Sequence, residues 1–177
     1  MEFAPGTKVI HPAHGLTTVT ERTEREVAGV ERTYLVLSRP QDDLVLHVPL
    51  DGEADADLRG VIGADDVPGV MDELRAEPAA LDANWRGLRA KNDARLHAGD
   101  VHGIAAVVRD LTVRRELRDR GLSVSEHRTL DRAMQRLCTE LDAALEDDAD
   151  PRELVDGVLA EVVEARTAAP ADTAEAA

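Results

Sequence analysis

The spacing of apolar residues changes near Asp57, and this change limits the fold more than any other feature of the sequence. Before Asp57, polar residues alternate with apolar and β-branched ones, as they do in strands with one buried face. These runs occupy residues 7–11, 15–26, 33–38 and 44–48. After Asp57, apolar residues recur at helical spacing, as they do in helices with one buried face. We therefore predict an α+β chain of two modules, in which a small β-barrel precedes an all-α helical bundle.

The boundary between the modules is expected within residues 51–57. This segment is acidic and poor in large apolar side chains, which is typical of a hinge. We assign residues 1–56 to the β module and residues 57–166 to the helical module. Residues 167–177 contain no large apolar side chain, so we expect a disordered tail.

Helix start and stop signals divide the second module. We expect short helices over 58–62 and 67–75 and a longer helix over 85–98. The next helix is expected to begin after an N-cap at Asp100 and to end at Gly121. Two further helices are expected, one that begins at a capping box formed by Ser123 and Glu126 and one that begins at Pro151. Apolar stripes predict the buried faces of the last two helices. They comprise Leu130, Met134, Leu137, Leu141 and Leu145, and then Leu154, Val155, Val158, Leu159 and Val162. Cys138 falls on the first stripe, which indicates a core residue and not a nucleophile.

Charge is distributed unevenly along the chain. The formal net charge is −15, and phosphate neutralisation supplies most non-specific DNA binding, so any DNA contact must be local or assisted by a partner. Residues 81–121 are the exception, with nine Lys and Arg against six Asp and Glu. They include the single tryptophan, Trp85. The cations that follow it are Arg86, Arg89, Lys91 and Arg95.

The sequence offers no pattern of catalytic or metal-binding residues. It contains no nucleophile and base at a known spacing and no phosphate-binding glycine loop. His11 and His14 stand three residues apart on a strand and its turn, where two imidazoles do not converge on one ion. A single cysteine excludes an internal disulfide and fits a reducing compartment. We expect a cytoplasmic monomer without catalytic activity, cofactor, metal or membrane segment.

Several short motifs, taken in order, resemble the CarD/CdnL family of bacterial RNA polymerase-binding transcription regulators. In the second module they are Asn84-Trp85, Ala98-Gly99-Asp100-Val101, Ala106-Val107-Val108-Arg109-Asp110-Leu111 and Arg120-Gly121-Leu122-Ser123. In the first they are Pro5-Gly6, Val9-Ile10-His11-Pro12, His14-Gly15, Tyr34-Leu35-Val36-Leu37 and Val48-Pro49. The resemblance extends over residues 1–145.

The resemblance implies a Tudor/SH3-like β module that binds the RNA polymerase β subunit by strand addition at an exposed sheet edge. It places polymerase contacts at Arg25 and at position 47, where this chain has His47 in place of an arginine. It implies that Trp85 wedges into promoter DNA at the upstream edge of the transcription bubble and stabilises the open complex. The cations expected to contact DNA are Arg86, Arg89 and Lys91. Such a regulator associates with the nucleoid through RNA polymerase.

Two alternatives stay open at this stage. Trp85 is either a core aromatic that packs near Leu88 or an exposed wedge, and we favour the wedge because its helix is poorly apolar. The protein either stabilises the open complex or is a polymerase-binding paralogue or competitor with weak or lost DNA contact. The second function is motivated by the net charge, by His47, and by Gly87, Leu88 and Ala90, which interrupt the basic run.

Overall fold

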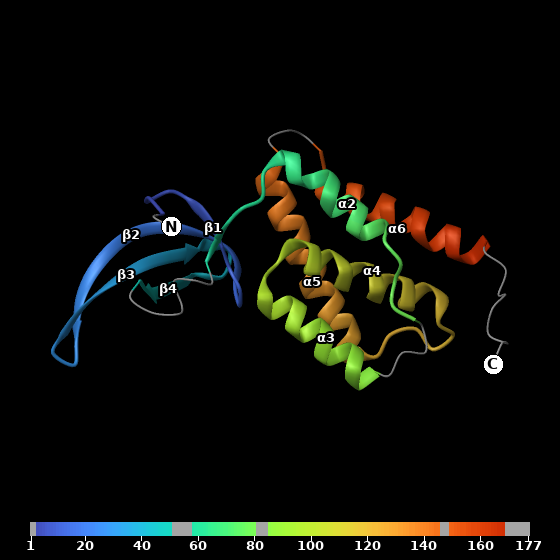
Figure 1. The fold of residues 1–177 in the computed structure, drawn as a ribbon, viewed down its shortest axis with the longest axis horizontal. Helices are drawn as coiled ribbons and strands as arrows, with labels where there is room; N and C mark the ends of the chain where they lie inside the picture. The colour runs from blue at the N-terminus through green and yellow to red at the C-terminus, as the bar shows by residue number, and fades with distance from the viewer. Residues whose placement is uncertain (1–2, 51–57, 81–84, 146–148, 169–177) are drawn as a thin grey trace.

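The computed structural model describes residues 3–50, 58–80, 85–145 and 149–168. An antiparallel sheet forms one end of the molecule and the helices form the other, in agreement with the predicted fold class (Figure 1). The predicted boundary at residues 51–57 lies outside the described residues, as does most of the predicted tail. The last helix runs to Ala168.

Five strands make up the sheet. They are β1 (Lys8–His11), β2 (Gly15–Val27), β3 (Val30–Arg39), β4 (Leu44–Pro49) and β5 (Arg59–Gly60), in the order β4-β3-β2-β1-β5. The four predicted strands are confirmed, but the predicted helix over 58–62 is wrong. Arg59 and Gly60 instead pair with Ile10 and Val9 of β1. This pairing satisfies backbone groups along an otherwise open edge of β1, and Leu58 is buried in the sheet's core, so these tertiary contacts outweigh a short helical pattern.

The core of the sheet lies on one face. It consists of Val9, Val19, Leu35, Leu37, Val48 and Leu58. A bulge between Val19 and Glu21 shifts the register between β2 and β3, and beyond it the two strands continue as a long hairpin that projects away from the helices (Figure 1). The hairpin turns at Ala28 and Gly29, both of which have positive φ (54° and 80°). Two central residues of this kind make the tight turn that matches the right-handed twist of the flanking strands.

Within the described residues, five α-helices follow the sheet. They are α2 (Val67–Arg75), α3 (Trp85–Ala98), α4 (Val101–Leu117), α5 (Val124–Ala144) and α6 (Pro151–Ala168). The Asp100 carboxylate accepts a hydrogen bond from the Gly103 backbone N–H at 2.7 Å, which confirms the N-cap of α4. Ser123 and Glu126 form the predicted capping box of α5. Helix α4 ends at Leu117, before the predicted stop at Gly121.

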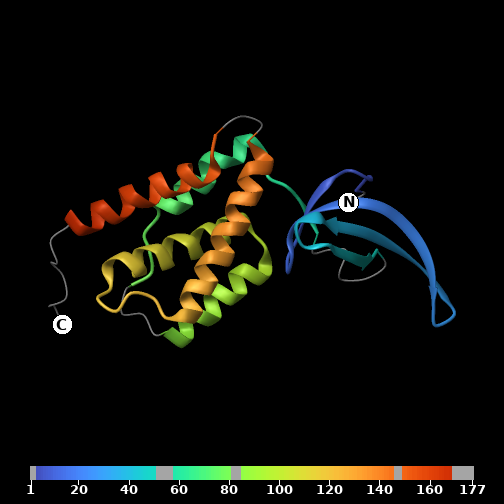
Figure 2. The ribbon, with the colours of Figure 1, turned by 180° about the vertical axis from the view of Figure 1, so that it is seen from behind.

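Helix α4 occupies the centre of the bundle and contacts the four other helices (Figure 1, Figure 2). The predicted stripe of α5 packs against it. In α6, Val155, Val158 and Leu159 are buried as predicted, whereas Leu154 is 37% exposed and the prediction for it is wrong. Successive residues on a helix point about 100° apart, and α6 buries only one face, so Leu154 turns away from the bundle when Val155 turns in. Cys138 is half-buried, and burial raises the pKa of its thiol.

Candidate functional site

Arg25 and His47 lie on the same face of the sheet. His47 of β4 stands opposite Val36 of β3, which in turn stands opposite Glu21 of β2. Side chains directly opposite each other across antiparallel strands share a face, as do residues two apart along one strand. Arg25 is four residues beyond Glu21 on β2, so it shares that face with His47. Both side chains are exposed.

Near its turn, over residues 23–34, the projecting hairpin separates charge between its two faces. Closer to the bulge the separation is lost, because Glu21 shares the face of Arg25 and Arg22 lies on the other face. Arg25 stands opposite Arg32, so two guanidinium groups occupy the face that holds His47. The other face of the same strands carries Glu24, Glu26 and Glu31. Sequence reasoning missed Arg32. The signal was the two-residue turn at Ala28 and Gly29, which fixes the partners of the residues between the turn and the bulge.

Strand β4 is an edge of the sheet. In the described part of the chain it pairs with β3 on one side and with nothing on the other. Val45, two residues before His47 and on the same face, is 56% exposed. The edge therefore presents unpaired backbone groups beside an exposed apolar side chain, which is the surface that strand addition uses.

Helix α3 carries the predicted DNA-contacting residues. Trp85 is its first residue, and the Trp85 side chain lies outside the described part of the structure. The helix packs on the bundle through a stripe at four-residue spacing formed by Leu88, Asn92 and Leu96. The predicted cations lie off this stripe. Arg86, Arg89 and Lys91 are all exposed.

The fourth cation of the basic run has a structural role. Arg95 donates a hydrogen bond at 3.2 Å to Asp110, a carboxylate that is buried in the bundle. Asp110 also accepts two hydrogen bonds from buried Arg109, at 2.9 and 2.8 Å. A buried carboxylate is stable only when it is paired and hydrogen-bonded, so these arginines serve the fold. The exposed positive surface is smaller than the sequence count over 81–121 indicates.

A second buried ion pair supports the start of α5. Arg114 donates to Glu126 at 2.9 Å, and Glu126 also accepts from the Ser123 backbone N–H at 2.7 Å. Burial opposes ionisation of Glu126, but the hydrogen bonds from Ser123 and the charge of Arg114 outweigh it and hold the pKa of Glu126 below its ordinary value.

A basic groove of about 490 Å³ lies between α3 and the first turns of α5. Its lining residues are Arg89, Asp93, Ser123, Val124, Ser125, Arg128, Thr129 and Arg132. Arg89 lies 3.5 Å from Asp93 in an exposed i,i+4 pair, which stabilises little. Sequence reasoning missed Arg128 and Arg132, because only the packing of α5 beside α3 brings them to Arg89.

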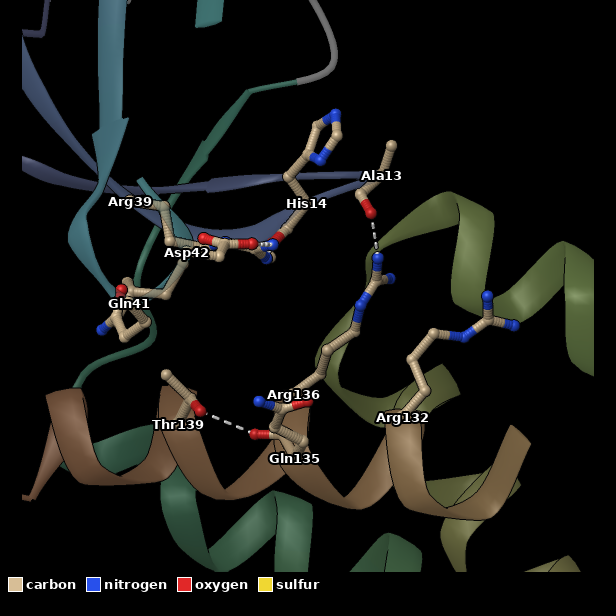
Figure 3. Close-up of a pocket in the computed structure, with 11 residues that line it drawn as sticks. Ala13, His14, Arg39, Gln41, Asp42, Arg132, Gln135, Arg136 and Thr139 are labelled. Atoms are coloured by element: carbon tan, nitrogen blue, oxygen red, sulfur yellow. Dashed lines mark hydrogen bonds and ion pairs between the residues drawn. The ribbon is translucent and has the colours of Figure 1, made fainter. Parts of the chain in front are cut away.

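Two arginines join the sheet to the helices, and we call them the junction arginines. Arg136 of α5 donates to the carbonyl oxygens of Pro12 (3.0 Å) and Ala13 in the turn between β1 and β2. It also donates to the Leu96 carbonyl at 2.9 Å. Figure 3 shows its side chain reaching from α5 to Ala13. The last turn of α3 and the turn of the sheet are thus held by one guanidinium.

The second junction arginine, Arg59 of β5, reaches in the opposite direction. It donates to the Gly99 carbonyl at 2.6 and 3.0 Å and to the carboxylate of Glu140 on α5, with one contact at 2.8 Å. At Gly99, φ is +68°, and a Cβ would lie 3.1 Å from the backbone Cα of Pro12. A side chain at this position would therefore hold a strained backbone conformation and would push the turn of the sheet away from the end of α3 by a few tenths of an ångström.

No group of metal-binding side chains and no membrane-spanning helix occurs within the residues that the structure describes. Two family models match the sequence. The model of the CarD-like/TRCF RID domain matches residues 3–62, which contain all five strands. The model of the CarD C-terminal domain matches residues 69–155, from α2 to the start of α6. The two matches adjoin at the junction between the sheet and the helices.

Proposed function

Because the chain belongs to the CarD family of RNA polymerase-interacting transcription regulators, we propose that its sheet docks on the polymerase β subunit while α3 presents Trp85 to promoter DNA. The contact with DNA lies at the upstream edge of the transcription bubble, where an inserted indole slows closure of the open complex. The family is one of non-catalytic regulators, and we expect no turnover by this member.

The observation that supports this function most directly is the linkage of α3 to the sheet by the junction arginines. Arg136 and Arg59 bind carbonyl oxygens at the end of α3, so a polymerase that holds the sheet also holds the helix. Tethering raises the effective concentration of α3 at the DNA. A weak local patch then suffices in a chain of net charge −15.

The polymerase contact is assigned to the face of the hairpin that carries Arg25, Arg32 and His47, together with the edge of β4. Backbone groups of an edge strand provide affinity by strand addition, and flanking side chains provide specificity. Two arginines on one face favour an acidic partner surface.

The DNA contact is assigned to Trp85, to the exposed cations Arg86, Arg89 and Lys91, and to the basic groove. Arg128 and Arg132 in that groove continue the positive surface from α3 onto α5. Phosphate contacts of this kind orient a protein on DNA without reading its sequence, whereas the indole acts on base stacking.

A second candidate function is a polymerase-binding competitor with little DNA contact. Three points favour it: His47 stands where the family resemblance places an arginine, Arg95 is bound to Asp110, and Arg89 is partly compensated by Asp93.

The lifetime of the promoter open complex, measured with purified cognate polymerase, separates the two functions. The proposed regulator lengthens the lifetime, and the competitor binds polymerase but leaves the lifetime unchanged or displaces another regulator. Failure to bind polymerase at all would contradict both functions.

A further inference from the structure

A recess lies between the sheet and α5, outside the surfaces assigned to polymerase and DNA above except for the shared residue Arg132. It has a volume of about 400 Å³. The sheet side contributes the turn between β1 and β2, Arg39 and the 3₁₀ helix η1 (Pro40–Asp42). The helical side contributes Arg132, Gln135, Arg136 and Thr139, which lie in a row along α5 (Figure 3).

Positive charge in the recess exceeds negative charge. Asp42 is the one carboxylate among the lining residues, and Arg39 already binds it, with 2.7 Å from Nε to Oδ1. The hydrogen bond from Arg39 holds the pKa of Asp42 below its ordinary value. Arg132 and Arg136 have no carboxylate partner in the described part of the chain. Two guanidinium charges therefore remain uncompensated.

The positive charge of Arg136 destabilises the folded protein as long as no anion compensates it. Arg136 is half-buried, and its hydrogen bonds go to backbone carbonyl oxygens, which carry no net charge. Burial lowers the pKa of Arg136, and the nearby charges of Arg132 and Arg39 lower it further. The bonds to carbonyl oxygens use its terminal nitrogens, and Nε–H has no partner among the described residues. The Arg132 guanidinium makes no hydrogen bond in the described part of the structure.

We propose that this recess binds a small anion that carries two linked phosphate groups, such as a pyrophosphate moiety. Guanidinium groups bind phosphate oxygens through paired N–H donors, and two uncompensated guanidinium groups match an anion of more than one charge. The volume is within the range of small-ligand sites and larger than a single phosphate needs. The side-chain amide of Gln135 supplies a further N–H donor, whereas the Thr139 hydroxyl already donates to the Gln135 carbonyl oxygen at 2.7 Å.

Both modules form the walls of the recess, so an anion bound there stiffens the junction between them. The site itself does not depend on the proposed function, because binding is measured on the isolated chain without polymerase or DNA.

The test is titration of the full-length protein with inorganic pyrophosphate by calorimetry at constant ionic strength, together with thermal melting. We expect saturable binding at one site and a melting temperature that rises with pyrophosphate concentration, since the ligand binds the folded state alone. Arg132→Gln should weaken binding by about tenfold or more, because it removes a charge-assisted contact. Gln135→Glu should weaken binding by a similar factor, because it places a negative charge beside the anion. Both side chains are exposed and make no hydrogen bond in the described part of the chain, so the unliganded proteins should melt like wild type.

Arg128→Gln is the matched control. It changes the net charge by the same amount as Arg132→Gln does, and both arginines lie on α5. Arg128, however, lines the basic groove and not the recess. Its affinity for pyrophosphate should equal that of wild type. Three outcomes would overturn the proposal: no saturable binding, equal weakening by Arg128→Gln and Arg132→Gln, or sulfate binding as tightly as pyrophosphate. Because Arg132 also lines the basic groove, competition by a short DNA duplex is measured in the Arg128→Gln protein, in which that groove is weakened. Displacement of pyrophosphate by DNA in that variant would reassign the recess to a backbone phosphate and would also overturn the proposal.

Discussion

Among the described residues, Ala28 has the backbone conformation that fits its side chain least well. Its φ of 54° is unfavourable for a residue with a Cβ, and asparagine tolerates this region better. We expect Ala28→Asn to raise the free energy of unfolding by about 0.5–1 kcal/mol in urea denaturation. Gly29→Ala, at the other central position of the turn, should lower it by about 1 kcal/mol. A stabilising effect of Gly29→Ala would contradict the turn geometry.

Trp85 distinguishes the wedge from the core interpretation, because the two give opposite results for Trp85→Ala. A wedge predicts little change in melting temperature and loss of open-complex stabilisation worth about 1–3 kcal/mol. A core aromatic predicts a loss of about 3–5 kcal/mol in the free energy of unfolding. We expect the wedge, measured by melting and by open-complex lifetime.

Leu88 on the same helix provides the internal reference for Trp85. It is 5% exposed, so Leu88→Ala should cost about 2–5 kcal/mol of stability. If Trp85→Ala destabilises the protein as much as Leu88→Ala while the folded fraction still gives a normal open-complex lifetime, the wedge is ruled out.

At the scale of elements, the β2–β3 hairpin makes a prediction about polymerase affinity. Arg25→Glu and Arg32→Glu should each weaken binding to polymerase, because they place like charge against an acidic partner, and His47→Arg should strengthen it. Equilibrium binding of the full chain to purified polymerase measures this. Glu24→Gln, on the opposite face of β2, is the control and should leave affinity unchanged. Equal affinity of all four variants would remove the hairpin from the interface.

The N-terminus of α5 makes a prediction about pH. The pKa of Glu126 is lower in the folded protein than its ordinary value, so its ionised form stabilises the fold, and this contribution is lost as pH falls through the folded-state pKa. Glu126→Gln should lower the free energy of unfolding by about 1–2 kcal/mol at neutral pH. The difference in unfolding free energy between this variant and wild type should narrow as the solution becomes acidic. Asp156→Asn, in an exposed pair with Arg152, should cost well under that amount. A pH-independent difference would contradict this account.

For the whole molecule, the junction arginines predict that one mutation can change the open-complex lifetime without changing the affinity for polymerase. Arg136→Gln removes charged donors to Pro12, Ala13 and Leu96, so it should preserve polymerase affinity but shorten the open-complex lifetime. Arg152→Gln, an exposed arginine on α6, is the control and should change neither quantity. Parallel loss of affinity and lifetime in Arg136→Gln would show that the junction does not transmit docking to α3.

How much of the structure was predictable from sequence depends on the range of the interactions involved. Caps and turns act within a few residues, so the C-terminal end of α3 was predicted from Gly99 and the start of α5 from Ser123. Strand β5 was missed because its partner β1 lies far away in sequence. The recess and the basic groove were missed for the same reason, since Arg39 and Arg128 gain their neighbours only when the sheet and helices pack. The site at Trp85 stays a prediction.

Because β2 is long, a small rotation at the junction between the sheet and the helices produces a large displacement of the docking face. Arg25 lies ten residues beyond Gly15, where β2 leaves the junction, so it is about 33 Å away along the strand. On a lever arm of that length, a rotation of about 5° at the junction displaces the docking face relative to α3 by about 3 Å. That displacement is comparable to the separation of stacked bases. Small rotations at Pro12 and Gly99 therefore determine whether an indole carried by α3 is positioned to insert between two adjacent bases.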